Sequence, residues 1–82
     1  MHMDRDIFRL EMATEATSLY ILICSILDDG APPTLQRVRS RWSTTEEDLQ
    51  RALEELVRRG VLPAAPPSEE AHLHPNPQSE WR

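Results

Sequence analysis

The chain has one cysteine, four aromatic residues and no lysine among its 82 residues. The single Cys24 excludes an internal disulfide and favours a reducing compartment, so we expect a cytoplasmic location. No hydrophobic run approaches the length of a membrane-spanning helix, and the start lacks the basic and then apolar segments of a secretory signal. A chain this short folds as one small domain without a deep cleft between domains, which argues against an enzyme.

The charge of −5 is unevenly distributed along the chain. Residues 1–31 carry a net charge of −4, residues 32–62 carry +1 and residues 63–82 carry −2. All nine basic residues are arginine, and six of them lie in the middle segment. Any surface for an acidic partner or for nucleic acid is therefore expected between residues 32 and 62.

The stretch from Ser43 to Leu62 has the clearest helical pattern. Four apolar residues recur at i, i+4, i+7 and i+8 and form one buried stripe: Leu49, Leu53, Leu56 and Val57. Thr44 followed by Glu47 fits a capping box at the start of the helix. Gly60 stands where a left-handed residue ends a helix, as in a Schellman motif.

Two further helices are predicted upstream. Residues Thr17–Leu27 are apolar on nearly every side, which is typical of a central helix or of one shared with a second copy. The candidates for such an interface are Tyr20, Ile21 and Cys24, although a cysteine in this setting is more often a core residue than a nucleophile. Gly30 and two prolines end this helix, and Thr34 caps a short one over Leu35–Trp42.

The two ends of the chain are less regular. Residues Asp6–Ala16 fit neither the helical nor the strand period, so a helix and a short strand both remain open. Five of the seven prolines follow Leu62, which predicts an extended tail held down by Trp81. The alternative is a hairpin that pairs residues 61–62 with residues 71–74. We therefore divide the chain into a helical core at 1–62 and a Pro-rich wing or tail at 63–82.

This order of elements, and the segment "TLQRVRSRWSTTEEDLQRALEELVRRGVL", resembles the winged helix-turn-helix superfamily. The pieces "GAPPT", "EEDL", "GVL" and "HP" also look like the amino-terminal helical domain of organomercurial (alkylmercury) lyase. The resemblance implies a mainly α fold, a three-helix winged helix-turn-helix with room for a short β-wing. The catalytic cysteines and aspartate of that lyase lie in a later domain and match no position here, so lyase activity is not implied.

In a winged helix the third helix would enter the major groove of DNA. Its candidate readers are Gln50, which can pair with adenine, and Arg51, which can pair with guanine. The acidic start of the same helix would repel phosphates. The acids also fit the helix dipole and i,i+4 ion pairs, which we expect for Glu47–Arg51, Glu54–Arg58 and Glu55–Arg59.

Arg37, Arg39 and Arg41 on the short helix have no acidic partner at helical spacing. They predict an uncompensated basic patch that could contact phosphate or an acidic protein surface, or could simply be solvated.

His72 and His74 have a spacing that could serve a metal, but a third ligand would have to be His2 or Cys24. We therefore expect no metal site, no cofactor and no small-molecule substrate.

Two functions from different classes follow. The first is a non-catalytic winged-helix module that binds a protein partner or a second copy of itself, which the apolar central helix and the acidic charge favour. The second is a small DNA-binding regulator that uses Gln50, Arg51 and the arginines of the short helix. A third interpretation is a detached relative of the lyase's amino-terminal domain.

Overall fold

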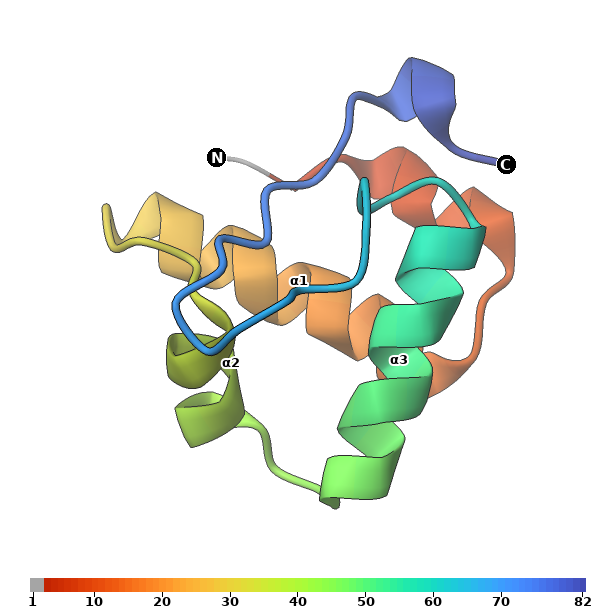
Figure 1. Cartoon of the computed structure of the whole chain (residues 1–82). Coiled ribbons are helices and arrows are strands. Elements are labelled where there is room, and N and C mark those ends of the chain that lie inside the picture. Colours follow the sequence, from red (N-terminus) through yellow and green to blue (C-terminus); the bar gives the residue numbers. More distant parts are fainter. Residues whose placement is uncertain (1–2) are drawn as a thin grey trace.

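Helix α1 (Thr14–Asp28) runs through the middle of the molecule, and the other elements pack around it (Figure 1). The structure is a computed structural model that describes residues 3–82. The remaining elements are two 3-10 helices, η1 and η2, and the helices α2 and α3. Their bounds are η1 Arg5–Leu10, α2 Leu35–Arg41, α3 Glu46–Arg58 and η2 Gln78–Glu80. The described chain is compact and mainly helical, as the sequence predicts.

The predicted central helix is confirmed, and it begins three residues earlier than expected, at Thr14. Leu19, Ile23 and Ile26 are fully buried on its inner face. Its end is a Schellman motif, in which the amide of Gly30 donates to Leu27 O (2.9 Å) and the amide of Ala31 donates to Ile26 O (3.2 Å). Gly30 has a φ of 77°, the left-handed conformation that glycine adopts at least cost.

Helix α2 begins as predicted, because the side chain of Thr34 accepts a hydrogen bond from the amide of Arg37 (3.1 Å). The predicted cap of α3 is wrong by one residue. Thr45, not Thr44, caps this helix, and its hydroxyl accepts from the amide of Asp48 (3.1 Å). The indole of Trp42 donates to the carbonyl of Thr45 (3.0 Å), which closes the turn on that residue.

Helix α3 ends in the predicted Schellman motif. The amide of Val61 donates to Leu56 O (2.9 Å), the amide of Gly60 donates to Val57 O (3.1 Å), and Gly60 has a φ of 76°. Leu49, Leu53 and Leu56 are buried as expected on the side of α3 that packs against α1, whereas Val57, the fourth residue of the predicted stripe, is only partly buried.

The ambiguous amino-terminal segment forms the 3-10 helix η1, which buries Ile7 and leaves Phe8 exposed. It ends at Glu11, the one non-glycine residue of the described chain with a positive φ (53°).

The alternative of a hairpin between residues 61–62 and 71–74 does not form. The segment pairs instead with the loop before α2: Leu35 N donates to Ala71 O (3.0 Å) and Leu73 N donates to Pro33 O (2.8 Å). This pairing is a single antiparallel bridge between Thr34 and His72, and residues 3–82 contain no strand. The pairing buries Leu73 in the core.

Trp81 anchors the tail, as expected. Its ring packs edge-on against Tyr20 of α1, with centroids 5.6 Å apart, and its indole donates to Asn76 O (3.0 Å). The blue tail in Figure 1 therefore crosses back over α1 and ends beside the carboxyl end of α3, where Arg82 N donates to Arg59 O (2.8 Å).

Candidate functional site

The predicted uncompensated basic patch on α2 is only partly present, because two of its three arginines form ion pairs with other elements. Arg39 forms ion pairs with Glu46 of α3 and with Glu69 of the tail (3.0 Å). Arg41 pairs with Asp29 at the end of α1 (3.4 Å). The guanidinium of Arg37 donates to the carbonyl of Pro32 (3.1 Å). Helical spacing could not reveal these partners, since they are distant in sequence or lie outside the helix.

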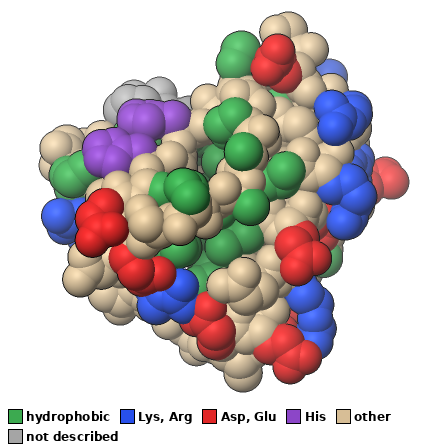
Figure 2. All heavy atoms as spheres, viewed as in Figure 1, with side chains coloured by type: hydrophobic (Ala, Val, Ile, Leu, Met, Phe, Trp, Pro, Cys, Tyr) green, Lys and Arg blue, Asp and Glu red, His purple; other side chains and the backbone are tan. Residues whose placement is uncertain are grey.

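The candidate DNA readers on α3 are also engaged. The amide of Gln50 donates to Glu46 (2.8 Å), and Arg51 pairs with Glu47 (2.7 Å) and Asp48 (3.9 Å). The expected pair Glu47–Arg51 is thereby confirmed. Acidic and basic side chains are interleaved along the lower and right edges of the surface in Figure 2.

The other two predicted pairs on α3 do not form. Glu55 accepts instead from the amide of Ala13 (3.3 Å). Arg59 donates to the carbonyl of Leu10 (2.6 Å) and to the carbonyl of Arg82, so it ties both ends of the chain to α3. Within residues 3–82, Glu54 and Arg58 form no ion pair with each other.

Two of the three candidate interface residues lie inside the core. Tyr20 and Cys24 are each 2% exposed, whereas Ile21 is 39% exposed. Tyr20 and Cys24 are buried because the tail and the segment at η1 cover their side of α1. Ile21 is therefore the one candidate interface residue that stays accessible.

Burial also determines the chemistry of these two side chains. It raises the pKa of Tyr20 from 10.0 to about 12, against the opposing hydrogen bond that the hydroxyl accepts from the amide of Asp4 (2.9 Å). Burial likewise raises the pKa of the Cys24 thiol. A buried thiol with a raised pKa is a poor nucleophile, so this cysteine acts as a core residue.

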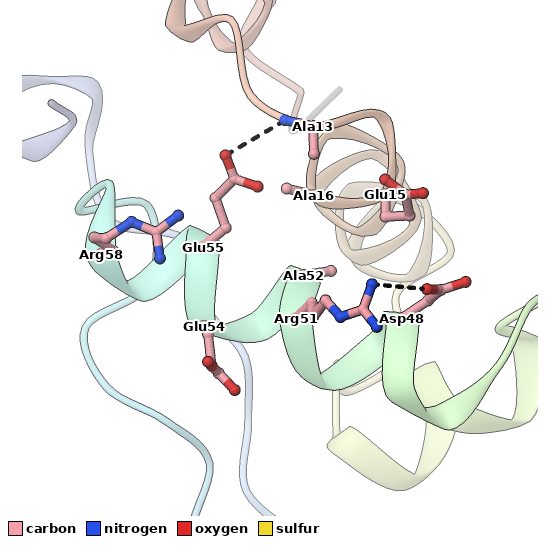
Figure 3. Close-up of a pocket in the computed structure, with 9 residues that line it drawn as sticks. All are labelled: Ala13, Glu15, Ala16, Asp48, Arg51, Ala52, Glu54, Glu55 and Arg58. Carbon is pink, nitrogen blue, oxygen red and sulfur yellow. Dashed lines mark hydrogen bonds and ion pairs between the residues drawn. The ribbon is translucent and has the colours of Figure 1, made fainter.

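A polar groove lies between the start of α1 and the outer face of α3 (Figure 3). It has a volume of about 300 Å³, and the buried Ala16 and Ala52 form its floor. Its charged side chains are Glu15 from α1 and Asp48, Arg51, Glu54, Glu55 and Arg58 from α3. The sequence analysis missed this groove. The signal was present in α3, where these positions recur at intervals of three and four and therefore share a face.

Several charged side chains of the groove lack partners. Arg51 is paired with Asp48, and Glu55 is bonded to Ala13, as the dashed lines in Figure 3 show. Glu15, Glu54 and Arg58 are exposed and have no ion pair or side-chain hydrogen bond within the described part of the chain. Two acids and one base around an alanine floor are therefore free to contact a second molecule.

His72 and His74 are both exposed and lie side by side, with ring centroids 5.7 Å apart (Figure 2). Cys24 is buried in α1, and His2 lies outside the described residues. Among residues 3–82, no three His, Cys, Asp or Glu side chains are grouped to hold a metal ion.

No family model, curated protein or solved structure matches this chain. None of the helices between residues 3 and 82 is long and apolar enough to cross a membrane.

Proposed function

We propose that the chain is a non-catalytic helical module of the winged helix-turn-helix type that binds a protein partner in the groove between α1 and α3. The observation that carries this proposal is the set of unpaired side chains at the groove, Glu15, Glu54 and Arg58. An exposed charge that has no partner in its own chain can form a charge-assisted hydrogen bond across an interface without first breaking one.

The order of elements supports the helix-turn-helix assignment. Helices α2 and α3 are joined by the short turn of residues 42–45, and α3 packs against α1. A Schellman glycine ends α1 before α2 and also ends α3. The segment that would form a wing is the tail, which bridges to the loop before α2 at Thr34 and His72.

The groove favours a short segment that carries at least one basic residue. Four carboxylates and two guanidiniums line it, so its net charge is negative. Ala16 and Ala52 are almost fully buried, so a bound segment would contact chiefly the charged side chains that line the groove. Charge complementarity of this kind sets orientation and specificity more than affinity.

Duplex DNA is the less favoured partner. A protein gains affinity for DNA by releasing counterions as free Lys and Arg side chains neutralise phosphates. Here Arg39, Arg41 and Arg51 are already neutralised by carboxylates of the same chain. The start of α3 would in addition bring Glu46 and Glu47 toward the phosphates.

The test measures mass in solution, by light scattering after size exclusion, with and without a random duplex at low salt. We expect the mass to be unchanged by DNA. A mass that rises with duplex and falls again as salt increases would contradict the proposal. Arg41→Glu and Arg51→Glu should then abolish that rise.

The groove itself is tested by capture of partners from the cells that make this protein. Wild type and Arg9→Glu, a charge reversal at an exposed residue outside the groove, should retain the same partner. Glu15→Arg should lose it, since the basic residue of the bound segment then meets a guanidinium in place of a carboxylate. Retention by the Glu15 variant would place the interface elsewhere.

A further inference from the structure

The segment that carries His72 and His74 is held firmly against the helices. Leu73 between them is 2% exposed, and its amide donates to Pro33 O (2.8 Å). Side chains of an extended segment alternate between its two sides. Because Leu73 points into the core, both neighbouring imidazoles project outward, where they are exposed and adjacent.

The spacing of the two rings matches that of two imidazoles on one tetrahedral metal ion. A Zn–N bond of about 2.0–2.1 Å, a ring nitrogen about 1.1 Å from its centroid and an angle of about 109° place two such centroids about 5.2 Å apart. The observed separation is 5.7 Å, with the rings tilted by 38°. The two rings are therefore close enough to bind one ion between them.

We propose that His72 and His74 form half of a Zn²⁺ site, and that the same two residues of a second copy complete it. Structural zinc sites are tetrahedral with four protein ligands, and imidazole is a common ligand of this ion. One chain offers two ligands, and no third ligand joins them among residues 3–82. A two-fold axis through the ion supplies the other two imidazoles from an identical surface.

The charge of the chain makes the proposed pairing dependent on a bound cation. Each copy carries −5, so two copies repel one another without an ion between them. A divalent cation at the contact reduces that repulsion, which makes the pairing dependent on zinc.

The experiment uses the full chain without a purification tag. Light scattering after size exclusion is run in ZnCl₂, in MgCl₂ and in EDTA, and calorimetry with ZnCl₂ gives the stoichiometry. We expect the mass to double in zinc alone, with one ion bound per two chains. Substituting Co²⁺ should give the intense visible absorption of a tetrahedral site.

Single variants assign the ligands. His72→Asn and His74→Asn should each abolish the zinc-dependent doubling, with unchanged helical circular dichroism, because both side chains are exposed. His2→Asn is the matched control and should dimerise like wild type. Arg58→Glu should also still dimerise, which separates this site from the groove.

Three results would overturn the proposal. The first is no zinc-dependent change in mass. The second is one ion per chain at constant mass, which would exclude the shared site. The third is dimerisation that survives His72→Asn or disappears in His2→Asn.

Discussion

Helices α1 and α3 contact one another along the core, yet they are built in opposite ways. Helix α3 has a narrow apolar stripe, a side-chain cap from Thr45 at its start and charged residues on its outer face. Helix α1 is apolar nearly all round, and its N-cap residue, Ala13, provides no side-chain cap. A side chain of α3 instead holds the start of α1, since Glu55 accepts the backbone amide of Ala13 itself (3.3 Å). Local sequence thus specifies α3, whereas α1 depends on its neighbours.

The largest effect is expected from the buried face of α1. Ile23→Ala removes a fully buried side chain and should lower the free energy of unfolding by about 2–5 kcal/mol. Ile21→Ala, two residues away and 39% exposed, is the matched control and should cost less than about 1 kcal/mol. Urea denaturation followed by circular dichroism measures both. Equal costs would mean that α1 is covered on both sides.

The two glycines that end α1 and α3 give the next comparison. Both have a positive φ, so alanine at Gly30 should cost about 1–2 kcal/mol from backbone strain alone. At Gly60 a Cβ would in addition overlap the carbonyl oxygen of Glu80, so Gly60→Ala should cost about 3 kcal/mol. Similar melting temperatures for the two variants would show that Glu80 of the tail does not pack closely against Gly60.

Tyr20 reports on the burial of α1 through pH. Its pKa is raised from 10.0 to about 12, so folding favours the neutral phenol. The neutral phenol thereby adds about 2–3 kcal/mol to the free energy of unfolding. This stabilisation is fully present below pH 10 and is lost as the pH rises from 10 to about 12. Tyr20 is the single tyrosine, so ultraviolet difference absorbance follows it alone. Titration near pH 10 in the folded protein would contradict its burial.

The smallest effects are expected at the two helix starts. Thr45→Ala removes the cap of α3 and should cost about 1 kcal/mol. Ala13→Ser adds a cap to α1 and should gain about 0.5–1 kcal/mol. If the Ala13 variant gains nothing, a serine hydroxyl at this position does not reach the first-turn amides of α1. Thr44→Ala is the control and should be neutral, because Thr44 lies outside the helix.

Much of the helical fold could be predicted from sequence because its signals are local. The stripe on α3, the cap at Thr34 and the glycines at both helix ends depend on residues within a few positions of each other. The errors arose where the competing partner was distant. Residues 71–73 of the tail pair with the loop at Thr34 instead of with residues 61–62, since this pairing buries Leu73.

The candidate site shows the same limit. Arg39 and Arg41 were predicted to be free because neither has an acid at i±4, but their partners Glu69 and Asp29 come from other elements. The groove could not be predicted either, since its lining combines Ala16 of α1 with Ala52 of α3.

The sequence by itself determined the three main helices, where two of them end, and the buried leucines of α3. Periodicity, capping and left-handed glycine act within one or two helical turns, so they can be read along the chain. Tertiary structure alone decided which charges are neutralised and where the tail packs. It also decided that Tyr20 and Cys24 lie inside while Ile21, His72 and His74 lie outside. Those outcomes depend on which surfaces meet in space, and no local pattern encodes that.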